Sequence, residues 1–202
     1  MKDNMKDKNH VAFVNSLRRY GYDVGNLDFV GINHRLGDKK NLKSVVKCAM
    51  SEQLVGHALK YHGFQFFSKD DVRDPSFDVV EDFHNLKFYK GSSPVFEFDF
   101  VGKHKNNFYV VEVKSSNLHS YLDSVDEVLS NARHAFRKDP YLLIFASIKP
   151  NVDLSEFYSK SIDRVSIIDM DISPKDYNWA LSKYFSGRGD FNNEISDILK
   201  EL

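Results

Sequence analysis

The run of residues from Pro94 to Lys114 constrains the fold more than any other part of this sequence. Apolar and polar residues alternate along Pro94–Val101 and again along Phe108–Lys114, and this period of two is typical of β-strands. The intervening Gly-Lys-His-Lys-Asn-Asn has the composition of a turn. The pattern therefore predicts a β-hairpin in which Val101 pairs with Val110.

Segments on either side of this hairpin carry the signatures of helices and further strands. Apolar residues recur at helical spacing in Val11–Tyr20, Ser44–His62, Asn117–Arg137 and Ile195–Leu202. A further helix is expected after Ser173, with Ser173 as its cap and Pro174 at its first position. Short apolar runs predict strands at Leu27–Ile32, Phe64–Phe67, Tyr141–Ile148 and Arg164–Met170. The acidic, irregular stretch Ser68–Lys90 predicts an insertion or a flexible loop.

The order of these elements predicts the fold class. It reads helix, three strands, helix, two strands, helix, which favours an α/β domain with helices packed on a central mixed sheet. A length of 202 residues suits one domain. We divide it into an N-terminal extension over residues 1–43, a core over residues 44–172 and C-terminal helices over residues 173–202.

Composition excludes several classes of protein. Hydrophobic residues make up 42% of the chain, enough for a core, so global disorder is excluded. Cys48 is the only cysteine, which excludes an internal disulfide framework and a multi-cysteine zinc site. The longest apolar run, Tyr141–Ile148, is far shorter than the ~18–20 residues of a membrane span, and Met1 is not followed by an apolar signal segment. We therefore expect a cytoplasmic protein with no membrane partner and, without a Gly-rich phosphate loop, no nucleotide cofactor.

The net charge of −1 is a cancellation between four blocks of opposite sign. The formal charge is +5 over residues 1–60, −4 over 61–100, +2 over 101–150 and −4 over 151–202. Glu97 and Asp99, in the second block, lie where a cation site would need acids. The near-zero total therefore does not exclude DNA as a partner, because affinity can come from local patches and a bound metal.

The predicted hairpin gathers charged residues on one face. Side chains alternate across a strand, so the register places Asp99 beside Glu112 and Glu97 beside Lys114. Adjacent carboxylates in apolar strands are unfavourable unless a cation neutralises them. Mg²⁺ binds a few carboxylates and keeps several waters, so it is a natural cation for such a site. Glu52 lies on the apolar stripe of the preceding expected helix, where a further inward-facing carboxylate is expected.

These residues resemble the signature of a known superfamily. Glu112-Val113-Lys114, with Asp99 one hairpin upstream and Glu52 on a preceding helix, looks like the PD-(D/E)XK nucleases. Within that superfamily the layout is most similar to archaeal Holliday-junction-resolvase-like enzymes, including nucleases of crenarchaeal viruses. The resemblance covers about residues 44–148, and Phe98 stands where the family has proline.

The resemblance implies a fold and an activity. The fold is the restriction-endonuclease-like αβββαβ core with N- and C-terminal additions. Asp99 and Glu112 would be metal ligands, Lys114 the catalytic lysine, and Glu52 an acid that contributes directly or through water. The implied activity is Mg²⁺-dependent hydrolysis of phosphodiester bonds in DNA, including branched DNA, with Mn²⁺ able to substitute. The implied partners are DNA and a second copy of the chain in a homodimer, in the host cytoplasm if the protein is viral.

Further polar residues are candidates for DNA contacts. They are Lys103, His104 and Lys105 on the expected turn, Ser115 and His119 after the lysine, and Arg133 on the long helix. A solvated turn and a solvated helix face remain open alternatives for them. For the whole chain, the alternatives are a catalytically inactive nuclease fold that binds DNA or assembles, and an α/β interaction protein in which Glu97–Lys114 is an ordinary cross-strand ion pair.

Overall fold

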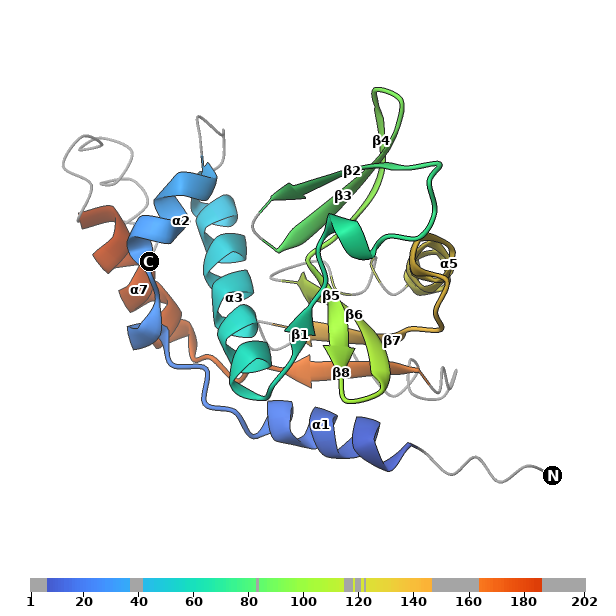
Figure 1. Cartoon of the computed structure of the whole chain (residues 1–202). Helices are drawn as coiled ribbons and strands as arrows, with labels where there is room; N and C mark the ends of the chain where they lie inside the picture. The colour runs from blue at the N-terminus through green and yellow to red at the C-terminus, as the bar shows by residue number, and fades with distance from the viewer. Residues whose placement is uncertain are drawn as a thin grey trace.

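The computed structural model describes residues 7–36, 42–82, 84–114, 118, 121, 123–146 and 164–186. The helices are α1 (Lys8–Arg18), α2 (Phe29–Leu36), α3 (Leu42–Tyr61), α5 (Val125–Phe136) and α7 (Pro174–Ser186), with short 3-10 turns η1 (Val24–Asn26) and η2 (Lys69–Asp71). The strands are β1 (Gln65–Phe66), β2 (Asp78–Asp82), β3 (Asn85–Lys90), β4 (Ser93–Phe98), β5 (Phe100–His104), β6 (Asn107–Lys114), β7 (Tyr141–Ala146) and β8 (Val165–Asp169). The predicted α/β class is confirmed, since a mixed sheet is flanked by helices (Figure 1).

The central sheet contains five strands in the described part of the chain, in the order β1-β5-β6-β7-β8. β1, β5 and β6 are antiparallel neighbours, whereas β6, β7 and β8 run parallel. The predicted pairing of Val101 with Val110 is confirmed. The hairpin thus joins the antiparallel half of the sheet to its parallel half.

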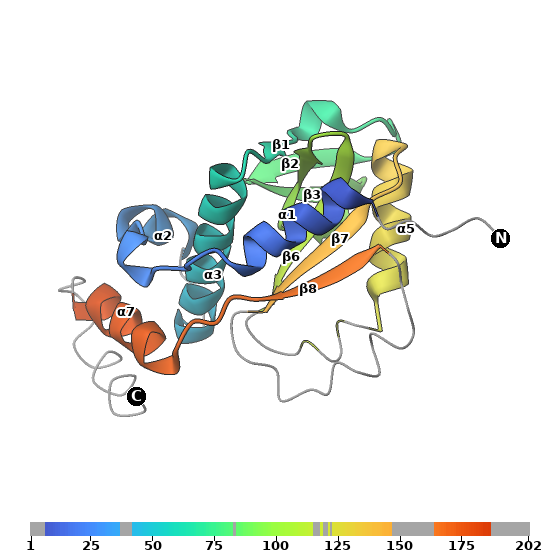
Figure 2. The ribbon, with the colours of Figure 1, turned by 90° about the horizontal axis from the view of Figure 1, so that it is seen from below.

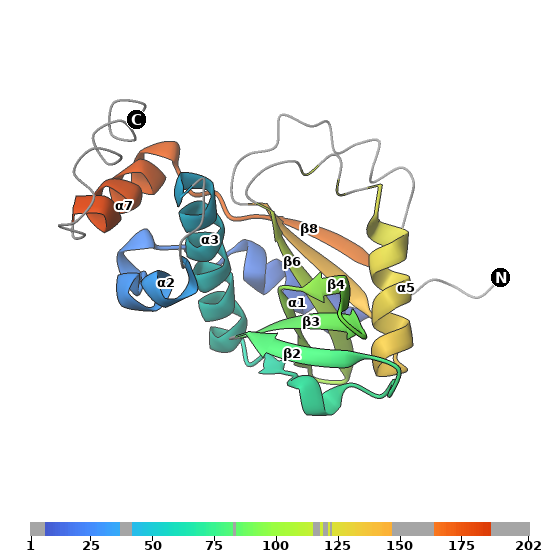
Figure 3. The same ribbon diagram turned by 90° about the horizontal axis from the view of Figure 1, so that it is seen from above.

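Two hydrophobic clusters cover the two faces of this sheet. On one face α1, α2, α3 and α7 pack around Tyr109, Val111 and Phe145. On the other face α5 packs on Val110 and Ile144. Figure 2 shows α1 crossing the strands, and Figure 3 shows α3 and α5 on either side of the sheet. Because β6 is covered on both faces, its sequence is a nearly continuous apolar run, and a charged residue within it is conspicuous.

The segment Ser68–Lys90, expected to be an insertion or a flexible loop, is folded, so the flexible-loop alternative is wrong. Its strand β2 pairs with β3, and β3 pairs with β4, in a second, antiparallel sheet that has three strands among the described residues. Aromatic packing explains the order, since the ring of Phe88 stacks on that of Phe96 at 4.4 Å between centroids. The outer strand β2 is mostly exposed and acidic, which gave the segment the composition of a loop.

The strand predicted at Leu27–Ile32 is also wrong. The carboxylate of Asp28 accepts a hydrogen bond from the backbone N–H of Val30, and helix α2 begins at Phe29. This local side-chain bond at the start of the helix overrides the β-propensity of the apolar run. In the described residues, none of the helices is long and apolar enough to cross a membrane.

The remaining helix predictions have mixed outcomes. Within the helix expected from Asn117 to Arg137, Leu118 and Tyr121 are helical, a turn follows at residues 123–124, and α5 then runs from Val125 to Phe136. The predicted cap at Ser173 is confirmed, because its hydroxyl accepts a hydrogen bond from the backbone N–H of Asp176. The helix predicted at Ile195–Leu202 lies outside the described residues.

Candidate active site

Strand β6 carries Glu112 and Lys114 to one end of the central sheet. Glu112 is buried, with 4% of its surface exposed. Lys114, the last residue of the strand, donates a hydrogen bond from Nζ to Glu112 Oε2 at 2.7 Å. The other oxygen, Glu112 Oε1, is buried and has no partner of full hydrogen-bond geometry in the described part of the chain, although the Tyr121 hydroxyl and the Asp99 backbone N–H approach the carboxylate. A buried acceptor left without a partner is unfavourable, so this oxygen marks a place where a ligand would be stabilised.

Asp99 reaches the same end of the sheet because the strand predicted at Pro94–Val101 is broken there. Phe98 packs in the cluster with α5, whereas Phe100 packs on the opposite face with α3. At the break, Asp99 Oδ2 accepts a hydrogen bond from the backbone N–H of Val113 at 2.7 Å. The carboxylate therefore takes the place of the backbone carbonyl that an unbroken strand would have offered, and it is fixed next to the Glu112 end of β6.

The predicted position of Glu97 beside Lys114 is wrong. Because the chain breaks at Asp99, Glu97 belongs to β4 and pairs with Lys87 of β3, with 3.9 Å between Lys87 Nζ and Glu97 Oε1. Its carboxylate also accepts a hydrogen bond from Asn85 Nδ2 at 3.2 Å. Lys114 consequently pairs with Glu112, two residues away on its own strand.

The electrostatics of this end of the sheet are unusual for carboxylates. Burial raises the pKa of Asp99 well above its usual value, and the charges of Glu112 and Glu52 raise it further. Burial also raises the pKa of Glu112, although Lys114 opposes this shift. Burial lowers the pKa of Lys114, but the two carboxylates outweigh it and the pKa lies above its ordinary value. Lys114 is therefore held in its protonated, positively charged form, whereas ionisation of both Asp99 and Glu112 is unfavourable.

Glu52 approaches the pair from α3. Its charge raises the pKa of Asp99, which places it within electrostatic reach. It does not complete a three-residue cluster: within the ranges that the structure describes, no three His, Cys, Asp or Glu side chains are grouped so that they could hold a metal ion. The structure therefore brings Asp99, Glu112 and Lys114 together and leaves Glu52 beside them.

The residues at this site fit a hard divalent cation. Mg²⁺ is usually bound by one or two carboxylates and keeps several waters, so Asp99 and Glu112 are a sufficient protein contribution. A cation held by these carboxylates would give Glu112 Oε1 a partner and would offset the burial and the neighbouring negative charges that raise their pKa values. Glu52, whose charge reaches Asp99, would be the next acid available to a water on such a cation.

Two residues that the sequence analysis missed border Lys114. Its Nζ lies 4.2 Å from the centre of the Tyr121 ring. Burial raises the pKa of the Tyr121 hydroxyl, and the charges of Glu112 and Asp99 add to this shift. The half-buried Cys48 also contributes to the raised pKa of Lys114. Cys48 precedes Glu52 by four residues on α3 and so shares its face, which is a signal that the sequence did contain.

The residues of the hairpin turn lie at the opposite end of β5 and β6 from the carboxylates. Lys103 is exposed there. The ring of His104 stacks on Phe13 of α1 at 4.0 Å between centroids. Lys105 donates a hydrogen bond from Nζ to Asn9 Oδ1 at 3.2 Å. Two of these three candidates for DNA contacts therefore join the turn to α1.

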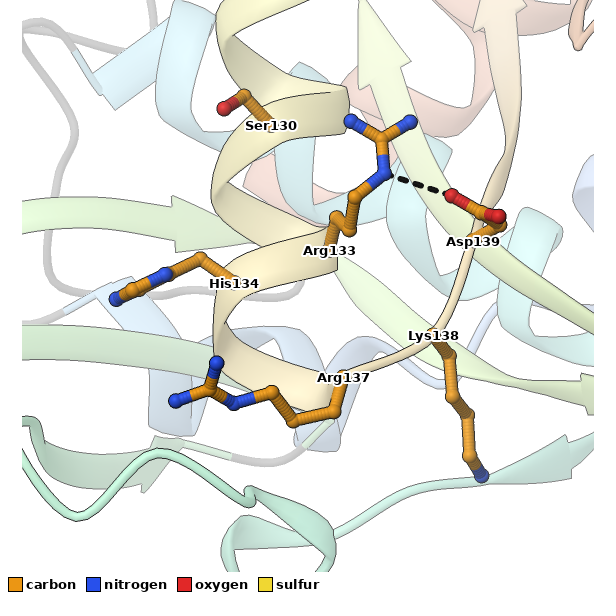
Figure 4. Close-up of a pocket in the computed structure, with 6 residues that line it drawn as sticks. All are labelled: Ser130, Arg133, His134, Arg137, Lys138 and Asp139. Carbon is orange, nitrogen blue, oxygen red and sulfur yellow. Dashed lines mark hydrogen bonds and ion pairs between the residues drawn. The ribbon is translucent and has the colours of Figure 1, made fainter.

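Arg133 is also remote from the carboxylates, at the C-terminal end of α5 (Figure 4). Its Nε donates a hydrogen bond to Asp139 Oδ1 at 2.7 Å. The surrounding basic side chains border a cavity of about 460 Å³ that is lined by Ser130, Arg133, His134, Arg137, Lys138 and Asp139. The last two candidates for DNA contacts, Ser115 and His119, lie outside the described residues.

Comparison with known proteins gives distant structural neighbours and no family. No protein-family model and no curated protein matches the chain. The crystal structure of protein VC1899 from Vibrio cholerae is similar, with a TM-score of 0.42 and 14% identity over 90% of this chain and 53% of that one. The structure of Can2 from Sulfobacillus thermosulfidooxidans in complex with cyclic tetra-adenylate has a TM-score of 0.32 and 13% identity over 90% of this chain and 57% of that one. The chain thus spans little more than half the length of either neighbour, and a likeness at this level assigns no function.

Proposed function

We propose that this chain is a Mg²⁺-dependent deoxyribonuclease with the restriction-endonuclease-like core of the PD-(D/E)XK superfamily. The observation that carries the proposal is the meeting of Asp99, Glu112 and Lys114 at one end of the central sheet. Paired carboxylates with raised pKa values suit a divalent cation, and a permanent positive charge beside them suits a phosphodiester.

Each residue has a role that follows from its surroundings. Asp99 and Glu112 would hold the cation, and Glu52 would orient one of its waters. A divalent cation bound there lowers the pKa of a water and offsets the negative charge of the scissile phosphate. Lys114 remains protonated, so it acts through its charge, by orienting the attacking water or by stabilising the charge that develops on the phosphate.

The finer features of the proposal rest on the resemblance of the motif. They are a preference for branched DNA and a two-fold dimer as the active form. A symmetric dimer suits a symmetric substrate such as a four-way junction, because each subunit presents the same site to one half of it. Mn²⁺ is expected to substitute for Mg²⁺, since carboxylate and water ligands accommodate both ions.

One observation favours a second candidate function, a nuclease fold that binds DNA without cutting it. Lys114 is hydrogen-bonded to Glu112 and lies over the Tyr121 ring. This ion pair neutralises the Glu112 carboxylate without a metal. Such a pair would stabilise the fold of a protein that no longer cuts DNA.

A cleavage assay separates the two candidates. Labelled linear and four-way-junction DNA are incubated with the protein in Mg²⁺, Mn²⁺ or EDTA. We expect cutting only with a divalent metal, and its loss in Glu112→Gln. Asp139→Asn is the matched control, because Asp139 pairs with Arg133 beyond the C-terminal end of α5 and its charge does not act on Glu112 or Asp99. DNA binding without cutting by the wild type would support the second candidate, and a Glu112→Gln variant that cuts at the wild-type rate would refute the proposal.

A further inference from the structure

A second cavity lies next to the candidate active site. It encloses about 290 Å³ and is bordered by α2 and α3 on one side and by β1, β5 and the residues that begin β3 on the other. Figures 1 and 3 show α2 and α3 side by side next to the smaller sheet. We call this space the α3 cavity.

The α3 cavity adjoins the carboxylates through two of its lining residues. Phe100 lines the cavity and directly follows Asp99 in the chain. Glu52 also lines it, and its charge is felt by Asp99. These two links place the α3 cavity where the nucleotide next to a phosphate at Asp99 would lie.

One side of the α3 cavity is aromatic. The ring of His84 stacks on that of Phe66 at 4.6 Å between centroids and an interplanar angle of 19°. The ring of Phe100 lies 5.8 Å from that of Phe66 and 6.1 Å from that of His84. Clustered planar rings of this kind are the surfaces on which proteins stack unpaired bases.

The other side of the α3 cavity is polar. Glu52, His57 and Lys60 line it from successive turns of α3. Together these side chains offer both hydrogen-bond donors and acceptors, as the edge of a nucleobase requires. A planar heteroaromatic ligand with a polar edge matches the aromatic side of the cavity with its ring and the polar side with its edge.

The size of the α3 cavity limits the ligand. Its 290 Å³ greatly exceeds the ~30 Å³ that one water occupies in the liquid. It lies just below the range for small-molecule sites, about 300–1,000 Å³. The cavity therefore suits a ligand smaller than a typical drug-sized molecule, such as one base.

We propose that the α3 cavity binds one unpaired nucleobase next to the phosphate that is cut. The substrate is then single-stranded DNA, or a duplex distorted enough to release a base, as at a branch point. This inference rests on the proposed function, because the base belongs to the strand whose phosphate is at Asp99. It adds a substrate class that the carboxylates by themselves do not specify.

Gly56 offers a variant that fills the cavity and keeps the fold. A Cβ at Gly56 would meet the Phe100 ring at 3.5 Å, an ordinary contact, and methionine is a better helix former than glycine. Gly56→Met therefore places a side chain in the α3 cavity. Gly21→Met is the matched control, since nothing lies within 4 Å of a Cβ at Gly21. Thermal unfolding of both variants verifies that they are folded.

A series of single-stranded substrates, each with one abasic site at a different position, tests the proposal. We expect the wild type to cut about tenfold more slowly when the abasic site lies at one fixed distance from the cut, and normally elsewhere. Gly56→Met should cut the unmodified strand at that reduced rate and ignore the abasic site, and Gly21→Met should behave as the wild type. Wild-type cutting that is the same for every abasic position would overturn the base site and leave the proposed function intact.

If no DNA is cut, the proposed function fails, and binding tests the base site by itself. A single strand that carries 2-aminopurine is titrated with protein in EDTA. We expect 2-aminopurine fluorescence to be quenched by the wild type and by Gly21→Met, because the base stacks on the aromatic side of the cavity. Equal fluorescence with Gly56→Met and with the wild type would overturn the proposal.

Discussion

Carboxylates pair with basic side chains at two ends of this molecule, and the pair is buried at one end and exposed at the other. At the end of the central sheet, the buried Asp99 and Glu112 share Lys114, and burial raises both carboxyl pKa values. At the end of α5, Arg133 and Asp139 form an ion pair with more than half of each side chain exposed. The hydrogen bond from Arg133 lowers the pKa of Asp139.

The direction of the shift separates a structural pair from a candidate site. A lowered carboxyl pKa means that the folded protein already stabilises the charge, so no further ligand is needed. A raised pKa means that the fold holds a carboxylate in surroundings that disfavour it, which is common where a ligand or metal completes the arrangement. The sheet end is therefore the better candidate for catalysis, although the α5 end displays more basic side chains.

The largest expected difference between the two ends is in DNA cleavage by lysine variants. Lys114 and Lys138 both lie over aromatic rings, at 4.2 Å from the centre of Tyr121 and 4.8 Å from that of Phe67. Lys114→Met is expected to slow the chemical step about 100- to 1,000-fold, because it removes a charge that stabilises the transition state. Lys138→Met should stay within about twofold of the wild type. Single-turnover cleavage at saturating DNA measures both, and equal losses would erase the distinction between the two ends.

The next largest effect is on stability without metal. Asp99→Asn is expected to stabilise the protein in EDTA at neutral pH by about 1–2 kcal/mol, since it removes a charge beside Glu112. The amide oxygen can still accept the hydrogen bond from Val113. Mg²⁺ should raise the melting temperature of the wild type and have little effect on Asp99→Asn. Chemical denaturation with and without Mg²⁺ measures both effects.

The matched variant at the α5 end is Asp139→Asn, which should lose a little stability rather than gain it. A loss of stability in Asp99→Asn as well, in EDTA, would mean that the charge of Asp99 is already satisfied. The two ends would then be alike, and the metal site would have no electrostatic basis.

The pH dependence of stability should also have opposite signs at the two ends. Asp99 and Glu112 have raised pKa values, so their stabilising contribution is complete below the ordinary carboxyl pKa and is lost as the pH rises through the raised values. Asp74, which pairs with His134, has a pKa that its hydrogen bonds with Ser76 lower. Its contribution is present above the ordinary carboxyl pKa and is lost as the pH falls.

Melting temperatures in EDTA from about pH 2 to 8 separate these contributions, because the change at Asp74 falls below its ordinary pKa and the change at Asp99 falls above it. Relative to the wild type, Asp99→Asn should gain more as the pH rises, and Asp74→Asn should lose more over the same change. Mg²⁺ should reduce the first difference and leave the second unchanged. Parallel curves for all three proteins would show that neither carboxylate is perturbed by folding.

The parts of the fold that the sequence predicted are those fixed by local patterns. The pairing of Val101 with Val110 follows from alternation and a turn, and the cap at Ser173 follows from two adjacent residues. The small sheet was missed because its order comes from packing between distant residues. Phe88 contacts Phe96 on β4 and Phe136 on α5. Both partners lie outside Ser68–Lys90, so no pattern within that segment predicts these contacts.

The candidate site divides in the same way. Glu112 and Lys114 were predictable together because they are two residues apart on one strand, and Asp99 followed from the register. Glu97 was misplaced because the break at Asp99 depends on a tertiary hydrogen bond to Val113. Tyr121 could not be found from spacing, since its place over Lys114 depends on how the chain returns after β6.

The smallest expected effect is at the α5 ion pair itself. Arg133→Gln removes the bond to Asp139, in which both side chains are more than half exposed, so stability should fall by less than about 1 kcal/mol. High salt should shrink even that difference, because it screens exposed charges.

Cleavage at saturating DNA should be unchanged in Arg133→Gln, since Arg133 lies far from Asp99. DNA affinity at low salt can still fall if Arg133 contacts a phosphate, and that loss should be uniform across sequences. A slower chemical step in Arg133→Gln would instead place α5 in the active site, and the contrast between a satisfied ion pair and a carboxylate pair that needs a cation would no longer identify the catalytic end.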